Sequence, residues 1–169
     1  MAGLSRRFRK AGYTEPKFKL LLAGKSVFQH AVGSFEAYFN SNPFLFIYRD
    51  ENNLDSFITT ECEALGVKLP ILAKLAEPTL GQADTVMQGL SVTKFDSTQS
   101  IVIFNIDTFR PGFLLPNHLD LDRIDGYLEV FRGGGPNWSY VLPLGSDDYR
   151  VAETSEKVVI SNFCCTGLY

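Results

Sequence analysis

The sequence is poor in cysteine and histidine, and those it has form no metal-binding pattern. Its 169 residues include three cysteines and two histidines. No C-x-x-C pair and no Cys/His cluster occurs, which argues against a zinc site and against a disulfide framework. Free cysteines fit a reducing compartment, so we expect a cytoplasmic protein.

Long apolar segments are also missing. No apolar run approaches the roughly 20 residues that a membrane-spanning helix needs, so we expect no membrane partner. The first residues lead into basic side chains instead of an apolar core, which argues against a signal peptide. A net charge of −3 argues against general nucleic-acid binding. A nucleic-acid contact by the basic N-terminal residues is therefore the least favoured hypothesis.

What the sequence does have is an ordinary globular composition, 45% hydrophobic and 21% charged. This length and composition suit one domain, residues 1–169, with its own core. Strand and helix patterns alternate in its first two thirds. Helices are expected at 25–40, 54–65 and 82–90, and strands at 44–48, 69–76 and 100–107. The alternation predicts an α/β fold with a mainly parallel sheet and helices on both faces, which makes three layers.

The pattern changes after Pro111. Residues 126–131, 138–142 and 162–169 read as strands without helices between them, and a glycine-rich turn joins the first two. The adjacent Cys164 and Cys165 are expected on opposite faces of the last strand, one packed and one on the ligand side.

The N-terminal stretch MAGLSRRFRKAGYTEPK combines small residues with a basic cluster. A tight turn with bare backbone N–H groups, followed by fixed cations, suits the binding of a triphosphate. The structural alternative is a solvated basic face of a helix.

This stretch closely resembles the signature loop of nucleotidyltransferases that make activated sugars, which reads A-G-x-G-[ST]-R-[FL] and then P-K. Gly3, Arg7, Phe8 and the pair Pro16-Lys17 match, whereas Ser5 replaces the second glycine. Further motifs follow in the order of that family, and they cover nearly the whole chain. They are Gly81-Gln82, Asn105-Ile106-Asp107, Asp125-Gly126, Glu156-Lys157 and Thr166-Gly167-Leu168-Tyr169.

The resemblance implies a glycosyltransferase-A-like fold and the transfer of a nucleotide from a nucleoside triphosphate to a sugar-1-phosphate or a related phosphate. It also implies roles for residues. Ala2, Gly3, Leu4, Ser5, Gly81 and Gln82 would bind the nucleotide, and Arg7 and Lys17 would be catalytic. Asp107 would hold Mg²⁺. Gly126, Glu156, Lys157, Thr166 and Tyr169 would bind the sugar phosphate. The resemblance is to members from capsule or lipopolysaccharide gene clusters.

Each motif taken alone also has a structural explanation. Asp107 can cap a turn, Gly81-Gln82 can simply start a helix, and Glu156-Lys157 can be a surface pair in a turn. The order of the motifs along the chain, however, favours the nucleotidyltransferase hypothesis.

The chain also departs from the family pattern. It starts at Met1 inside the signature loop, without the usual preceding strand, and stops at Tyr169, before a second magnesium-binding aspartate. We therefore expect an incomplete fold whose open strand edges favour self-association into a homo-oligomer. These departures and Ser5 favour a second hypothesis, a catalytically inactive nucleotide-binding or interaction module.

Overall fold

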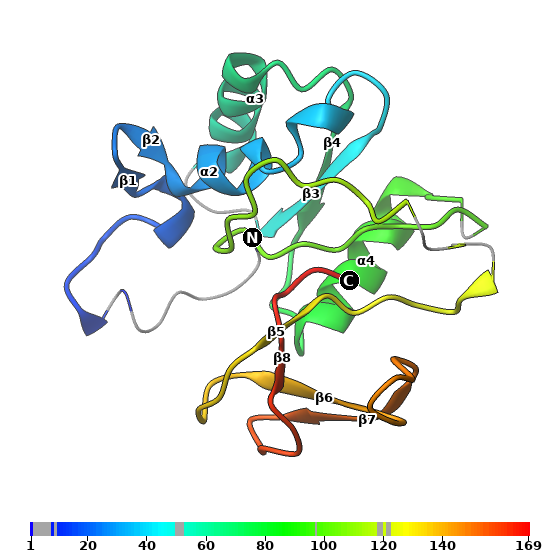
Figure 1. Ribbon diagram of the computed structural model, residues 1–169. Coiled ribbons are helices and arrows are strands. Elements are labelled where there is room, and N and C mark those ends of the chain that lie inside the picture. The colour runs from blue at the N-terminus through cyan, green and yellow to red at the C-terminus, as the bar shows by residue number, and fades with distance from the viewer. Residues whose placement is uncertain (2–7, 9, 50–52, 97, 118–119, 121–122) are drawn as a thin grey trace. The chain divides into compact units, whose positions relative to one another are not determined.

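The computed structural model (Figure 1) describes residues 1, 8, 10–49, 53–96, 98–117, 120 and 123–169. The chain divides into two compact units. Unit 1 consists of Met1–Ser100 and Phe109–Leu115, and unit 2 of Ile101–Thr108 and Pro116–Tyr169. The expectation of a single domain stays a prediction.

Unit 1 is built on two parallel strands, β3 (Phe44–Arg49) and β4 (Pro70–Leu75). Their register runs in step from one end to the other, beginning at Phe44 opposite Pro70 and ending at Arg49 opposite Leu75. Parallel strands need a crossover connection, and helix α3 (Leu54–Leu65) provides it. The predicted strands and the helix between them are confirmed.

Among the described residues, the other elements of unit 1 are helices α2 (Val27–Gly33) and α4 (Gln82–Thr93), the 3-10 turns η1 (Lys17–Lys19) and η2 (Glu36–Tyr38), and the hairpin of β1 (Leu21–Leu22) and β2 (Lys25–Ser26). No helix formed by the described residues is both long and apolar enough to cross a membrane.

Helices contact both faces of β3. The ring of Phe28 in α2 lies 5.3 Å from the ring of Phe46, measured between centroids. Helix α4 approaches from the other side, where an added Cβ at Gly89 would come within 2.3 Å of the Ile47 Cδ1 atom. Phe46 and Ile47 are consecutive, so their side chains point to opposite faces.

The single helix predicted over residues 25–40 is wrong, because the chain forms α2 and then η2. Helix α2 begins after Ser26, whose hydroxyl accepts a hydrogen bond from the Gln29 amide at 3.0 Å, as expected for a capping box. It ends at Gly33, a poor helix former. The Ser34 hydroxyl then accepts the Arg110 amide at 2.8 Å, which holds the chain where the helix ends.

Unit 2 contains a four-stranded sheet in the order β5 (Val130–Arg132), β8 (Phe163–Cys165), β6 (Ser139–Pro143) and β7 (Val151–Glu156). Every pairing in it is antiparallel, so the expectation of one mainly parallel sheet is not met here. The physical reason at β6 and β7 is their short connection, because a short turn joins neighbouring strands only when they are antiparallel and parallel neighbours need a long crossover.

The strand predicted over 100–107 is also wrong. The pairing that the structure describes for this segment is a single bridge between Phe104 and Leu168, flanked by two bonds between Ile103 and Tyr169. The N–H groups of Ile103 and Tyr169 donate to each other's carbonyl oxygens at 2.8 and 2.9 Å. One short pairing fixes too few residues to make a strand, and Val102 remains 47% exposed.

Gly167 is required where this bridge meets the end of the chain. Its φ is +93°, a conformation that costs other residues strain. A Cβ there would also lie 2.4 Å from the side-chain Nδ2 atom of Asn105. The close approach of Asn105 to Gly167 therefore connects two of the motifs within unit 2.

We predict that Gly167→Ala destabilises unit 2 by about 1–3 kcal/mol, because it combines backbone strain with a steric clash. Trp138 is the sole tryptophan and lies in unit 2, so its fluorescence during urea unfolding reports on this unit. Gly134→Ala is the matched control, because its Cβ would meet nothing within 4 Å. Equal unfolding midpoints for the two variants would contradict the requirement for glycine.

Candidate functional site

The register of the unit 2 sheet lines up three polar side chains. Ser139 on β6 stands opposite Glu156 on β7. Tyr140 stands opposite Cys164 on β8, which places the next pair, Ser139 and Cys165, side by side. Because side chains alternate along a strand, Cys165, Ser139 and Glu156 share one face of the sheet.

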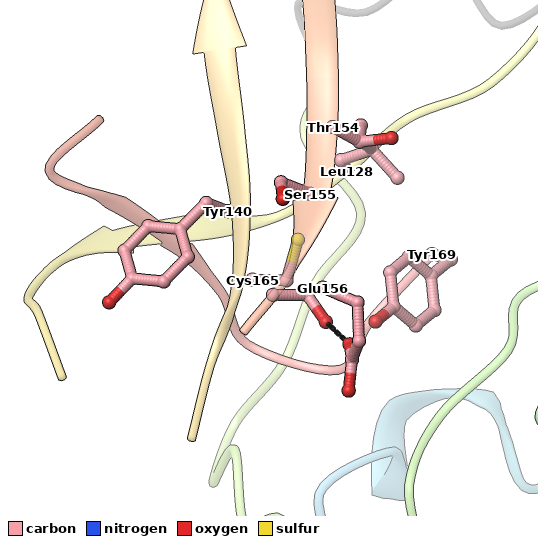
Figure 2. A pocket seen from close by; sticks show the side chains of 8 residues that line it. Leu128, Tyr140, Thr154, Ser155, Glu156, Cys165 and Tyr169 are labelled. Carbon is pink, nitrogen blue, oxygen red and sulfur yellow. Dashed lines mark hydrogen bonds between the residues drawn. The ribbon is translucent and has the colours of Figure 1, made fainter. Parts of the chain in front are cut away.

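A pocket of about 270 Å³ opens over this row. Its lining combines hydroxyl, carboxylate, thiol and apolar groups from Leu128, Ser139, Tyr140, Thr154, Ser155, Glu156, Cys165 and Tyr169. Figure 2 shows the Glu156 and Tyr169 side chains next to each other, while the Tyr140 ring points away from them. The Tyr140 hydroxyl donates instead to the Gly135 carbonyl oxygen at 2.6 Å. The chemistry of the pocket therefore centres on Glu156, Ser139 and Tyr169.

Both carboxylate oxygens of Glu156 have partners. The Ser139 hydroxyl donates to Oε2, and the Lys157 ammonium lies 2.9 Å from Oε1. The hydrogen bond from Ser139, followed by that from Lys157, lowers the pKa of Glu156 below its ordinary value. The pocket thus presents an ionised carboxylate beside a cation.

Lys157 has an unusual backbone. Its φ is +62°, in the left-handed region that non-glycine residues seldom occupy. Its amide donates to the Trp138 carbonyl oxygen at 2.9 Å, which holds this conformation just beyond the end of β7. Strained conformations of this kind cluster at ligand sites.

Cys165 and Tyr169 present neutral polar groups to the pocket. Burial raises the pKa of the Cys165 thiol, and the nearby Cys164 and Glu156 raise it further. Burial also raises the pKa of the Tyr169 hydroxyl, with smaller effects from Cys165 and Glu156. Cys165 therefore stays a thiol near neutral pH and is a poor nucleophile. Both cysteines are buried, but consecutive residues of a strand face opposite sides, and only Cys165 lines the pocket.

Two other residues predicted to bind the sugar phosphate lie elsewhere in unit 2. The Thr166 hydroxyl donates to the Glu129 carboxylate at 2.9 Å, and the Thr166 amide donates to the Glu129 carbonyl oxygen at 3.0 Å. Gly126 is exposed in the irregular segment before β5. Neither residue lines the pocket, whereas Glu156 and Tyr169 do and Lys157 adjoins it.

Asp107 lies in an exposed turn that follows the Phe104 bridge, where the Thr108 amide donates to the Asn105 carbonyl oxygen at 3.1 Å. Among the described residues, no cluster of three or more His, Cys, Asp or Glu side chains is arranged to hold a metal ion. A single exposed carboxylate still fits Mg²⁺, which takes most of its ligands from water and phosphate oxygens.

In unit 1, Gly81 precedes α4 and Gln82 is its first residue. Asp84 fixes this loop, since its carboxylate accepts the Leu80 amide at 2.7 Å and the Gln88 side-chain amide at 3.0 Å. These hydrogen bonds lower the pKa of Asp84. A Cβ on Gly81 would meet nothing within 4 Å, so the space beside this glycine is open.

The remaining predicted residues belong to the N-terminal segment. Lys17 is the first residue of η1 and is half-buried. Ala2, Gly3, Leu4, Ser5 and Arg7 lie outside the residues that the structure describes. Their roles stay predictions.

The sequence pattern alone did not single out Ser139. The signal that could have indicated it lies in its neighbours. Trp138 and Tyr140 favour a strand here, and in a strand Ser139 faces the side opposite to both aromatic rings. Its partner strand β7 has no apolar alternation, so its pairing with Glu156 could not be foreseen.

Comparisons with known proteins identify one informative relative. No protein-family model matches the sequence. No curated protein matches it either. Among solved structures, it is similar to the nucleoside-diphosphate-sugar pyrophosphorylase from Vibrio cholerae RC9, with 46% sequence identity and a TM-score of 0.90. The match covers 100% of this chain and 70% of that one. Such identity over this length shows common family membership and supports an α/β fold, and the chain therefore belongs to the same family of nucleotidyltransferases as that pyrophosphorylase.

Proposed function

We propose that the chain transfers a nucleotide from a nucleoside triphosphate to a sugar-1-phosphate or a related phosphate and releases pyrophosphate. The observation that carries this proposal is the pocket of unit 2, where the Glu156 carboxylate lies beside the Lys157 cation. The name of the 46% identical relative, a nucleoside-diphosphate-sugar pyrophosphorylase, supports the same reaction.

In this reaction, a phosphate oxygen of the acceptor attacks the α-phosphorus of the triphosphate. A new O–P bond forms as the bond to the β-phosphate oxygen breaks, and pyrophosphate leaves with the electron pair. Catalysis of phosphoryl-type transfer rests mainly on positioning and on neutralising charge. The protein therefore needs cations and hydrogen-bond donors more than it needs a nucleophile.

Unit 2 would supply the groups for the acceptor. The Lys157 ammonium binds its phosphate, and the Glu156 carboxylate and Tyr169 hydroxyl bind hydroxyl groups of the sugar. Asp107 would hold Mg²⁺, which when bound neutralises charge on the phosphate oxygens. Gly126 and Thr166 would line the sugar side, as the family resemblance implies.

Residues of unit 1 would supply the groups for the nucleotide. Backbone amides of residues 3–6 would cradle the triphosphate, and Gly81 and Gln82 would contact the base. Arg7 neutralises the leaving pyrophosphate, because its planar guanidinium can bind two phosphate oxygens at once. As the family resemblance implies, Lys17 would act as a point charge toward substrate phosphates.

We also propose that the product serves the synthesis of a surface polysaccharide and that the protein works in the cytoplasm, where nucleoside triphosphates are available. The support for this setting is the family resemblance of the motifs. The alternative function is a catalytically inactive nucleotide-binding or interaction module, which Ser5 favours because the signature has glycine there.

We predict that Arg7→Ala and Lys17→Ala each lower the rate of pyrophosphate release about 10²–10³-fold, the typical effect of removing one preorganised group that stabilises the transition state. Both variants should keep the thermal midpoint of the wild type. Lys68→Ala, which removes an exposed lysine of unit 1, is the control and should keep the wild-type rate. If either variant at Arg7 or Lys17 matched that control, its assigned role would be wrong.

We further predict that chelation of Mg²⁺ stops pyrophosphate release and that Asp107→Asn raises the Mg²⁺ concentration needed for half-maximal rate by about tenfold. The substitution keeps the shape of the side chain and removes its charge, and Mg²⁺ prefers charged oxygen ligands. The measurement is a Mg²⁺ titration of the rate, with the exposed Asp147→Asn of the same unit as control. Identical titration curves for the two variants would exclude Asp107 as a ligand.

A further inference from the structure

Two consecutive residues hold Glu156 and Lys157 in place: Trp138, just before β6, and Ser139, the first residue of β6. The Trp138 carbonyl oxygen accepts the Lys157 amide at 2.9 Å, and the Ser139 hydroxyl donates to the Glu156 carboxylate. The first contact fixes the backbone of Lys157, and the second fixes the side chain that pairs with its ammonium. Trp138 and Ser139 thus determine where the Lys157 cation is directed.

Stability does not explain this arrangement. The side chains of Glu156 and Lys157 are 65% and 59% exposed, and ion pairs between exposed side chains contribute little to folding. The left-handed backbone of Lys157 opposes folding instead. A strained backbone and an exposed, restrained ion pair beside a pocket are features expected of a ligand site.

The hydroxyl of Ser139 has a specific effect on this pair. Without it, the Glu156 carboxylate would keep a single partner, Lys157, and both long side chains could rotate together into solvent. With it, Oε2 is anchored to the sheet, so Oε1 holds the ammonium at a defined place. The hydrogen bond acts on the carboxylate and through it on the lysine, and Ser139 itself needs no contact with the acceptor phosphate.

We infer that Ser139 is a positioning residue, whose hydrogen bond to Glu156 directs the Lys157 ammonium toward the phosphate of the acceptor. This inference rests on the proposed function for the identity of the acceptor. The inference itself is that Ser139 acts through Glu156 on the binding of phosphate by Lys157. This effect can be measured without enzymatic turnover.

The test is NMR spectroscopy of the full chain carrying Ser139→Ala, Ser139→Thr or the control Ser146→Ala. Ser146 is an exposed serine of the same unit, and it bonds only weakly to Asp147, at 3.4 Å. We expect Ser139→Ala to raise the pKa of the Glu156 carboxyl, followed through its ¹³C signal. Inorganic phosphate, followed through the Lys157 amide, should bind about three- to tenfold more weakly. Ser139→Thr keeps a hydroxyl and should restore both properties, and all variants should keep the wild-type thermal midpoint.

The inference is overturned if Ser139→Ala leaves the pKa of Glu156 or the phosphate affinity equal to that of Ser146→Ala. It is also overturned if phosphate does not perturb Lys157 in the wild type. A parallel assay of pyrophosphate release separates this outcome from failure of the proposed function. If phosphate binding depends on Ser139 but no nucleotide supports release with any sugar-1-phosphate, the proposed reaction fails and the role of Ser139 stands. If release occurs, Ser139→Ala should raise the KM for the acceptor and leave the KM for the nucleotide unchanged.

Discussion

The antiparallel pairing of β8, β6 and β7 is the constraint on which the pocket depends. A strand fixes the direction of every side chain on it, so a single register decides which residues share a face. Here the register gives Cys165, Ser139 and Glu156 one face and leaves Cys164 and Tyr140 to the opposite one. A shift of one residue would exchange the two sets and remove the carboxylate from the pocket. The backbone hydrogen bonds of the sheet therefore determine its chemistry.

Unit 1 shows which structural elements local sequence patterns can predict. Strands β3 and β4 and helix α3 were predicted nearly to the residue, because apolar runs and the stop at Gly66 are local signals. Gly66 ends α3 with a φ of +82°, which glycine tolerates best. The pattern failed where a tertiary contact decides the outcome, since the serine that follows α2 bonds to a residue 76 positions away.

Unit 2 marks the limit of such predictions. Residues 101–106 are apolar except for Asn105 and have the composition of a buried strand. A strand forms only where a partner pairs along its length, and the sequence does not show the partner. Strand β7 was missed for the opposite reason, because most of its residues are polar and exposed and the strand has no apolar alternation. Motifs predict roles for Glu156, Lys157 and Tyr169, whereas Ser139 becomes visible only through its pairing with β7.

The central claim is that the pocket of unit 2 binds the acceptor of a nucleotidyl transfer. Cys165 reports on this directly, because it lines the pocket and is 8% exposed, more than Cys62 and Cys164, which are 1% and 0% exposed. Its raised pKa makes alkylation slow, so the rate is compared over long incubations. The measurement is the rate of Cys165 alkylation by iodoacetamide at pH 8.5, read by mass spectrometry, with and without a panel of sugar-1-phosphates. The account predicts that at least one sugar-1-phosphate protects Cys165 at saturation and that the free sugar protects it less. Alkylation at the same rate with every sugar-1-phosphate would contradict the claim.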